Sequence, residues 1–391
     1  MVPRLVILLA AGGCTFHVGA TGAGDAADAP PGDARDAADG SPGDASPCRA
    51  VEVSAMSAHS CARMETGDVW CWGINKRGEV GRPSQTACNG AAPCNPMPEK
   101  LALPPATRLG VAEEHSCVIT GTGVQCWGGN VQHQFGNGTG VDTAAPIIVT
   151  QRAGATQIGG GLSYGCSLHG TAVKCSGDNA NGEVGDNSSA QRPTPVTTVP
   201  SGVDAIATGY HHVCAIEGGF LYCWGDNGVG EVDSHPGADA KLPRIVMNIA
   251  TVKTAALGIG HTCVALAAGD LRCWGDNAAG QLGVGDTVPH PDQIATPVLT
   301  GIVELSAGAN HTCARTPAGS VYCWGERYGS IPVAITLPRP AISIASGSYH
   351  DCFALADGSV DCLGWNAYGQ LGLGTAFSTV SVTVSQVKLC P

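Results

Sequence analysis

The chain has 391 residues, including 56 glycines and 19 cysteines, and only 5% of its residues are aromatic. A core with few aromatic residues and many turns favours short strands over long amphipathic helices. The net charge is −12, and its repulsion of a polyanion leads us to expect no nucleic-acid partner. Cysteines in this number favour an oxidising compartment outside the cytoplasm.

Residues 1–14 are predicted to form a lipoprotein-type signal peptide. Arg4 supplies a positive charge, residues 5–11 form an apolar run, and Gly12-Gly13-Cys14 follows. The run is too short to span a bilayer. It resembles a bacterial lipoprotein signal, although Ala11 stands where that family usually has Leu. We therefore expect lipidation of Cys14 and a lipid anchor in the cell envelope, at the outer membrane or cell surface. The alternative is ordinary secretion, in which Cys14 is removed.

Residues 15–47 are rich in Asp, Ala, Gly and Pro, with no apolar residue larger than Ala or Pro after Val18. Such a segment cannot bury enough surface to offset its ordering entropy, which predicts a disordered tether. The remainder, residues 48–391, is predicted to be one repeat domain.

Fourteen cysteines form seven pairs of nearly constant spacing, and the pairs recur about every fifty residues. Each pair brackets a short hairpin pattern, so every repeat carries its own candidate disulfide. The pairs are Cys61 with Cys71, Cys117 with Cys126, Cys166 with Cys175, Cys214 with Cys223, Cys263 with Cys273, Cys313 with Cys323 and Cys352 with Cys362.

Turn chemistry predicts that the two cysteines of each pair face each other. Cysteines nine residues apart leave two-residue loops that begin with Gly, as a type II′ turn requires: Gly121-Thr122, Gly170-Thr171 and Gly218-Gly219. Cysteines ten apart leave three-residue loops with Gly third, the left-handed position: Glu65-Thr66-Gly67, Ala267-Ala268-Gly269, Pro317-Ala318-Gly319 and Ala356-Asp357-Gly358. Both patterns place the cysteines at a close, non-hydrogen-bonded rung, which predicts seven cross-strand disulfides. The alternative is buried free thiols.

Five cysteines lie outside these pairs. Cys88 and Cys94 share an insertion at residues 82–100 and are predicted to bond to each other. Cys48 precedes the first strand and Cys390 is the penultimate residue. If the repeats close into a ring, a Cys48–Cys390 disulfide would lock it, which leaves Cys14 for the lipid.

The repeat resembles that of the regulator of chromosome condensation family. The best copy runs from Gly260-His261-Thr262-Cys263 through Cys273-Trp274-Gly275-Asp276-Asn277 to Gly280-Gln281-Leu282-Gly283. The resemblance covers about residues 50 to 390 and implies an all-β fold, a seven-bladed β-propeller. The sixth copy departs most: after Trp324-Gly325 it loses the long connection, and we expect that blade to be short on one face.

Three recurring side chains could indicate chemistry. A histidine precedes the first cysteine by two residues in six repeats, and Tyr164 replaces it in the third; the histidines are His59, His115, His212, His261, His311 and His350. A Cys₂His zinc site is one reading, but recurrence in an oxidising compartment favours structural histidines that bond neighbouring backbone. We therefore expect no metal and no cofactor.

Asp-Asn pairs recur at one position before Gly, as at Asp276-Asn277, and favour turn-forming residues over catalytic carboxylates. The recurring tryptophans are interpreted as packing between blades, with a carbohydrate-stacking surface as the alternative; they are Trp72, Trp127, Trp224, Trp274 and Trp324.

The composition and the resemblance together favour a non-enzymatic, monomeric scaffold that binds a protein partner through its loops. The resemblance also implies a specific form of this role, because the family includes secreted propellers that inhibit β-lactamases. The alternatives are an extracellular polysaccharide- or peptide-acting enzyme with a site at the propeller centre and, with less support, guanine nucleotide exchange. The expected contact regions are residues 82–100, 133–145, 186–195 and 233–243.

Overall fold

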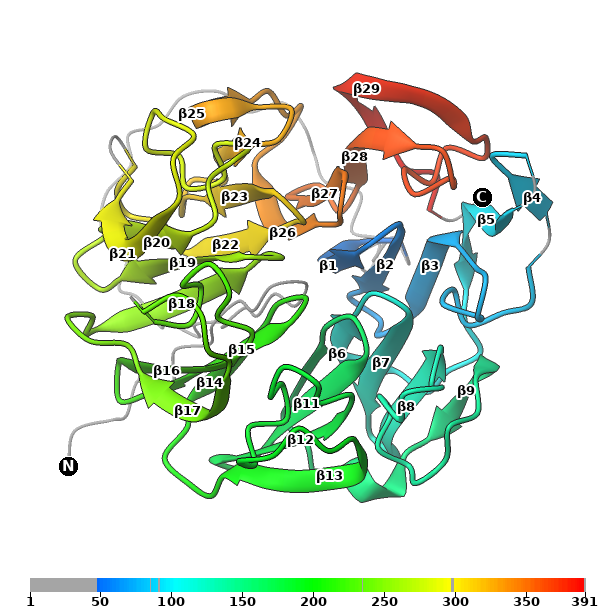
Figure 1. Ribbon diagram of the computed structural model, residues 1–391. Helices are drawn as coiled ribbons and strands as arrows, with labels where there is room; N and C mark the ends of the chain where they lie inside the picture. The colour runs from blue at the N-terminus through cyan, green and yellow to red at the C-terminus, as the bar shows by residue number, and fades with distance from the viewer. Residues whose placement is uncertain (1–47, 85, 91, 234, 297–298, 390–391) are drawn as a thin grey trace, which may run out of the picture.

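The computed structural model describes residues 48–84, 86–90, 92–233, 235–296 and 299–389. These residues form seven antiparallel sheets of four or five strands each, arranged as blades around a common axis (Figure 1). The seven-bladed, all-β propeller expected from the repeats is confirmed. Among the described residues the single helix is a short 3₁₀ turn, η1 (Thr150–Arg152), and no helix there is long and apolar enough to cross a membrane.

Each blade is built from consecutive strands, and we number the blades 1 to 7 in chain order. The innermost strands are β1 (Ala50–Met56), β6 (Ala106–Val111), β10 (Gln157–Gly160), β14 (Ala205–Thr208), β18 (Val252–Leu257), β22 (Glu304–Ala307) and β26 (Ala341–Ser346). The second strands are β2 (His59–Met64), β7 (His115–Thr120), β11 (Tyr164–His169), β15 (His212–Glu217), β19 (His261–Leu266), β23 (His311–Arg315) and β27 (His350–Leu355). The third strands are β3 (Val69–Ile74), β8 (Gly123–Gly128), β12 (Ala172–Gly177), β16 (Phe220–Gly225), β20 (Leu271–Gly275), β24 (Val321–Gly325) and β28 (Val360–Asn366). The outer strands are β5 (Ala92–Lys100), β9 (Thr143–Ile148), β13 (Arg192–Val199), β17 (Ala240–Ile245), β21 (His290–Ala295), β25 (Gly329–Ile335) and β29 (Phe377–Gln386), and β4 (Thr86–Cys88) adds a fifth strand to blade 1.

The ring closes between blades 7 and 1 without an exchanged strand. Innermost strands of neighbouring blades lie side by side around the axis, and β26 is next to β1. The amide of Ala50 donates to the Gly358 carbonyl at 2.9 Å, and the amide of Ser348 donates to the Ser57 carbonyl at 2.8 Å. Hydrogen bonds between blades therefore hold together the two ends of the ring.

The predicted disulfide is present in every blade, with directly opposed cysteines whose Cα atoms lie 4.1 Å apart. From blade 1 to blade 7 the disulfides join Cys61 with Cys71, Cys117 with Cys126, Cys166 with Cys175, Cys214 with Cys223, Cys263 with Cys273, Cys313 with Cys323 and Cys352 with Cys362. The pairing is the one expected from the sequence, and the alternative of buried free thiols is wrong.

The hairpin turns follow the expected types in part. All four three-residue loops have their Gly in the left-handed region, with φ between +81° and +92°. The two-residue loops follow the type II′ expectation only at Gly170.

The expectation of a type II′ turn is wrong in the other two loops. Gly218 and Gly219 both have positive φ, the pattern of a type I′ turn, because a second glycine permits it. Gly121 does not have positive φ. There, the Thr120 hydroxyl accepts the amide hydrogen of Thr122 and bonds the Gly123 carbonyl, so a side chain organises the turn.

Replacing both Cys117 and Cys126 by Ala should lower the free energy of unfolding by about 2–3 kcal/mol, because the disulfide closes a short loop in the unfolded chain. Guanidinium denaturation of the double variant and the wild type, both without reductant, measures the difference. Equal unfolding midpoints would show that this disulfide adds nothing to stability.

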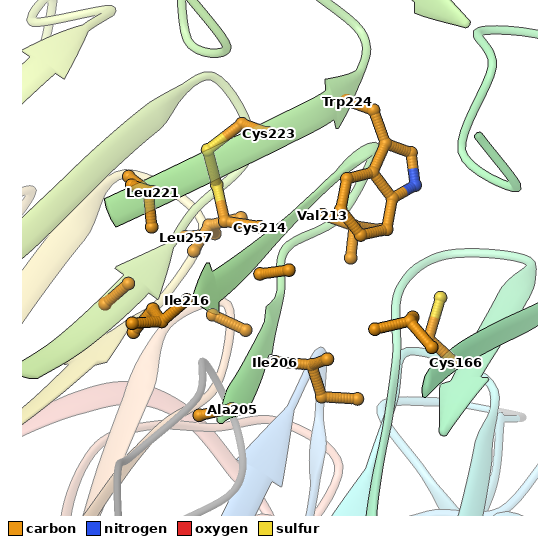
Figure 2. Close-up of a cluster of buried hydrophobic side chains, with 14 of the residues drawn as sticks. Cys166, Ala205, Ile206, Val213, Cys214, Ile216, Leu221, Cys223, Trp224 and Leu257 are labelled. Carbon is orange, nitrogen blue, oxygen red and sulfur yellow. A yellow bond between two sulfur atoms is a disulfide. The ribbon is translucent and has the colours of Figure 1, made fainter. Parts of the chain in front are cut away.

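The disulfides and tryptophans alternate through the core. Figure 2 shows the Cys214–Cys223 disulfide on the side of Leu257 and the Trp224 indole on the side of Cys166, which belongs to the preceding blade. All five recurring tryptophans are 0% exposed, and each shares a core cluster with the disulfide of the preceding blade. The predicted packing between blades is confirmed. A buried indole cannot offer a sugar a flat surface, so the carbohydrate-stacking alternative is wrong.

Each indole also bonds the blade before it. Its Nε1–H donates to a backbone carbonyl in the connection between that blade's third and outer strands. The pairs are Trp72 with Gln370 (2.8 Å), Trp127 with Glu79 (2.8 Å), Trp224 with Glu183 (2.8 Å), Trp274 with Glu231 (3.0 Å) and Trp324 with Gln281 (2.8 Å). The burial of the indole thus leaves no polar atom of its ring unpaired.

Five of the six recurring histidines bond the blade that follows. We expected backbone partners, but the Nε2 atom of the ring meets a side-chain oxygen one blade further on, a partner that no local pattern reveals. The pairs are His59 with Ser116 (3.0 Å), His212 with Thr262 (2.8 Å), His261 with Thr312 (2.9 Å), His311 with Asp351 (2.9 Å) and His350 with Ser60 (2.6 Å). Tyr164 places its hydroxyl 2.8 Å from the carbonyls of Gly209 and His212.

Replacing Thr312 by Val should lower the free energy of unfolding by about 1–3 kcal/mol, because the similar shape leaves His261 and the Gln281 carbonyl without this hydroxyl partner. The matched control is Thr197→Val on the exposed side of β13, where we expect a change within about 0.5 kcal/mol. Equal losses in the two variants would remove the support for a histidine–hydroxyl bridge.

The asparagine after the third strand holds each long connection. Its Oδ1 accepts the amide hydrogen of the residue five positions on. The pairs are Asn75 with Val80, Asn130 with Phe135, Asn179 with Val184, Asn227 with Val232, Asn277 with Leu282 and Asn366 with Leu371. Asp226 and Asp276 accept from the amide two residues on. The Asp-Asn pairs are therefore turn residues, as interpreted from their recurrence.

The remaining cysteines are placed in part. Cys88 and Cys94 form a disulfide with Cα atoms 5.9 Å apart. Cys48 is also disulfide-bonded. Its predicted partner Cys390, the lipidation site Cys14 and the proposed signal and tether in residues 1–47 lie outside the described residues.

Candidate interaction site

The repeat breaks down at two of the seven blade boundaries, where the recurring tryptophan is replaced. Ser176 stands at this position in blade 3 and Leu363 in blade 7. Other residues fill the space of the missing indole between blades 2 and 3. Between blades 6 and 7 a cavity remains.

Between blades 2 and 3, Phe135 and Arg152 occupy the space. Phe135 stands where other blades have Val or Leu, and it packs on the Cys117–Cys126 disulfide. The Arg152 guanidinium donates to the hydroxyls of Ser167 and Ser176 at 2.7 Å and also to backbone carbonyls. Burial lowers the pKa of Arg152 to about 10. A buried arginine with partners for its donors thus replaces the indole.

Between blades 6 and 7, both the indole and its acceptor loop are missing. β24 ends at Gly325 and β25 begins at Gly329, so the connection is three residues long. This confirms the shortened sixth blade. Arg327, in that connection, adopts a left-handed φ of 76°, which is uncommon for a residue other than glycine. A cavity of about 540 Å³ remains, lined by Arg327, Tyr328, Val333, Ile335, Leu363 and Val384 among others.

Asp351 joins the two blades beside this cavity. It takes the position at which four other blades have Ser or Thr, and its carboxylate is fully buried. It accepts from His311 at 2.9 Å, from Arg327 at 3.1 Å and from the Tyr328 hydroxyl at 2.5 Å. Burial alone would raise the pKa of Asp351, but His311, Arg327 and Tyr328 hold it well below its ordinary value. Burial and the Asp351 charge raise the pKa of Tyr328.

These residues do not fit a zinc site. His311, Cys313 and Asp351 have ligand atoms within 4.8 Å of one another. However, the Cys313 sulfur is bonded to Cys323, so it provides no thiolate. The same argument applies to the histidine beside the disulfide in the other blades.

An aromatic ridge, formed by Tyr349, Trp365 and Tyr368, lies on the face that carries the long connections, which we call the loop face. Trp365 meets Tyr349 at 5.8 Å between ring centroids and Tyr368 at 5.5 Å, both edge to face. The ammonium of Lys76, from blade 1, lies 5.6 Å from the Tyr368 centroid. Tyr349, Trp365, Glu326 and Arg327 line a shallow pocket. The ridge and the residues that flank it therefore span blades 6, 7 and 1.

The ridge was missed by sequence analysis because Trp365 stands two residues after the recurring tryptophan position. On a strand, a shift of two keeps the same side, but Trp365 lies near the end of β28, where the chain leaves the core. The Cys362-Leu363-Gly364-Trp365 departure was the signal that could have revealed it.

A tyrosine joins two blades that are far apart in the sequence. Tyr210, from blade 4, packs with Met56 and Ala112 and reaches across to bond the Ser348 hydroxyl of blade 7 at 2.7 Å. Beside it, burial and the neighbouring Glu114 charge raise the pKa of Glu113 to about 7.

The contact regions expected from the sequence occupy two kinds of position. The insertion at 82–100 is largely part of blade 1, since β5 pairs with β3 and β4 pairs with β5. The regions 133–145, 186–195 and 233–243 include connections on the loop face. There, Asp186 pairs with Arg192, and Asp233 pairs with Arg244 at 3.0 Å.

Known families and structures agree with this architecture. Models of the regulator of chromosome condensation (RCC1) repeat match residues 268–315 and, in a second version, residues 50–79, 252–281 and 341–370. The protein is therefore a seven-bladed β-propeller with segments similar to the RCC1 repeat. No curated protein matches its sequence.

Several solved structures share the fold. Human WBSCR16 superposes with a TM-score of 0.70 at 19% identity, covering 82% of this chain and 94% of that one. Prp20p from Saccharomyces cerevisiae has a TM-score of 0.70 at 19% identity, covering 82% and 86%. The ectodomain of the Physcomitrella patens receptor kinase CR4 has a TM-score of 0.51 at 20% identity, covering 81% and 73%. At these identities the likeness concerns the fold alone.

Proposed function

We propose that this protein is a non-enzymatic, monomeric scaffold that binds a protein partner through its loop face, with the aromatic ridge as the main contact. The ridge is the observation that carries the proposal. Tyrosine, tryptophan and arginine dominate the energetics of protein interfaces because they bury large areas and retain polar atoms for hydrogen bonds. Here Tyr349 is 39% exposed beside the partly buried Trp365, and Lys76 and Arg327 flank them.

Two further observations support a binding role. A disulfide links two strands of each blade, so the loops extend from a rigid scaffold that loses little conformational entropy on binding. The structural neighbour Prp20p is described as binding Gsp1p and histones, which shows that this fold can present protein-binding faces. Those partners belong to Prp20p. An inhibitor role, in which the loop face covers an enzyme, is one specific form of the proposal.

Affinity capture with matched baits tests the proposal. The purified propeller is immobilised and exposed to a cell-envelope extract, alongside the double variant Tyr349→Ala, Trp365→Ala. The control is Phe220→Ala, an aromatic residue 48% exposed at the hairpin end of blade 4. We expect a partner that the wild type and the control retain equally and that the double variant retains at least about tenfold less. Equal retention by all three baits, or no specific partner, would contradict the proposal.

We also propose that the protein works outside the cytoplasm, lipid-anchored through Cys14 or secreted. The disulfide of every blade supports this, because cytoplasmic thiols are kept reduced. Alkylation of intact cells before lysis should leave the blade cysteines unmodified until reductant is added. A Cys14→Ser variant should move from the membrane fraction to the soluble fraction if the anchor is present. Free thiols in freshly lysed cells would contradict the proposed compartment.

A further inference from the structure

We propose that the cavity between blades 6 and 7 is a binding site for a small aromatic carboxylate of about the size of an indole acid. The proposal does not require the protein-binding role of the aromatic ridge, although Arg327 lies beside both the ridge and the cavity. It rests on the shape of the cavity, on its position in the repeat and on the unpaired donors of Arg327.

The shape of the cavity follows from the repeat. At five boundaries a buried indole packs on the preceding disulfide and donates to a carbonyl of the preceding blade. At the boundary of blades 6 and 7, Leu363 replaces the indole and the three-residue connection omits the loop that supplies the acceptor. Apolar side chains of β25 and β29, together with Leu363, form walls around about 540 Å³, within the range of small-molecule sites. Small-molecule sites of this size are lined mainly by apolar side chains, with a few polar groups that orient the ligand.

The polarity of the cavity indicates the charge of the ligand. Arg327 lines it, and the Nε and Nη1 atoms of its guanidinium are buried without a hydrogen-bond partner, while Nη2 bonds Asp351. Buried unpaired donors are costly, and a carboxylate oxygen is a strong acceptor for a guanidinium N–H. Hydroxyl-bearing Thr336 and Thr383 also line the cavity.

The contrast with blades 2 and 3 strengthens the assignment. There the missing indole is also accompanied by an arginine, but the Arg152 guanidinium bonds serine hydroxyls and backbone carbonyls of the chain itself. Phe135 fills the apolar part of that space. Between blades 6 and 7 an arginine also lines an apolar space. There, no residue in the described part of the chain bonds the Nε and Nη1 donors of Arg327.

Titration calorimetry of the oxidised full-length protein with indole-3-acetate tests the proposal, and indole-3-acetamide is the uncharged probe. We expect indole-3-acetate to bind wild type and to bind at least about tenfold more tightly than the amide. The Arg327→Met variant should lose that preference. Leu363→Trp, which restores the residue of five other blades, should fill the cavity and abolish binding of both probes.

The matched control is Arg339→Met, which removes an exposed arginine from the neighbouring groove and should leave binding unchanged. Circular dichroism of each variant confirms that it is folded, and Arg327→Met keeps the test decisive if Leu363→Trp does not fold. Three results would each overturn the proposal: no binding of indole-3-acetate by the wild type, equal binding of acid and amide, or unchanged binding in the Arg327→Met variant.

Discussion

Replacing Asp351 by Ala should lower the free energy of unfolding by about 3–5 kcal/mol, because it removes the shared acceptor of a buried cluster. His311, Arg327 and Tyr328 all donate to this carboxylate. Without it, the Arg327 charge would be left largely buried with no opposing charge in contact. Urea denaturation of the oxidised protein measures the loss.

A second substitution separates the contributions. Asp351→Thr introduces the residue found at this position in blades 5 and 6, so the His311 bond can persist while Arg327 loses its partner. We expect a smaller loss than for Asp351→Ala. The control, Asp357→Ala, removes a carboxylate at an exposed hairpin and should cost less than about 1 kcal/mol. If Asp351→Ala proves as stable as the control, the cluster does not hold blades 6 and 7 together.

Acidification from pH 6.5 should destabilise the propeller, and more steeply below about pH 4.5 than above it. Burial lowers the pKa of five recurring histidines from 6.5 to about 3, namely His59, His115, His212, His261 and His350. Below pH 6.5 the unfolded chain therefore binds protons that the folded chain excludes, and stability falls as the pH falls towards 3. Each such imidazole lowers the free energy of unfolding by up to about 1.4 kcal/mol for each pH unit of acidification in this range.

Three buried carboxyls oppose this trend above pH 4.5. Burial raises the pKa of Glu113, Glu231 and Glu304 from 4.5 to about 7. Between pH 7 and 4.5 the folded chain binds protons at these groups before the unfolded chain does, so they stabilise the fold as pH falls. Below pH 4.5 both states are protonated there, and the effect of the histidines is no longer opposed by these carboxyls.

Denaturation midpoints measured from pH 7 to pH 3 test this curve. The variant His261→Gln removes one imidazole while keeping an amide near Thr312. It should reduce the slope of the free energy of unfolding against pH by about 1.4 kcal/mol per pH unit, which corresponds to one proton. A stability that stays flat from pH 6.5 to 3.5, or a variant with an unchanged slope, would show that the imidazoles are not held neutral by burial.

Much of the fold could be predicted from local pattern. The cysteine spacing and the third-position glycines of the longer hairpins determine which residues face each other, so disulfides and strand register follow from neighbours in sequence. The repeated tryptophan was correctly interpreted as packing between blades, because a residue that recurs at one structural position in successive blades is a feature of the repeat.

The features that distinguish this chain were not predictable in the same way. Arg152 fills the space of the indole that is missing from β12, where Ser176 stands. Asp351 stands where other blades have a hydroxyl, and its partner His311 lies 40 residues earlier. Tyr210 crosses the axis to Ser348, 138 residues away. Such contacts depend on how the ring brings distant turns together. One sequence carries no signal for them beyond a departure from its own repeat.

Photo-crosslinking in intact cells tests most directly the claim that the sector where the repeat departs is the interaction site. A photoreactive phenylalanine analogue is placed at position 365 in one variant and at position 220, on the hairpin side of blade 4, in another. We predict a specific protein adduct from position 365 and none from position 220. Adducts from position 220 alone, or from neither position, would contradict the account.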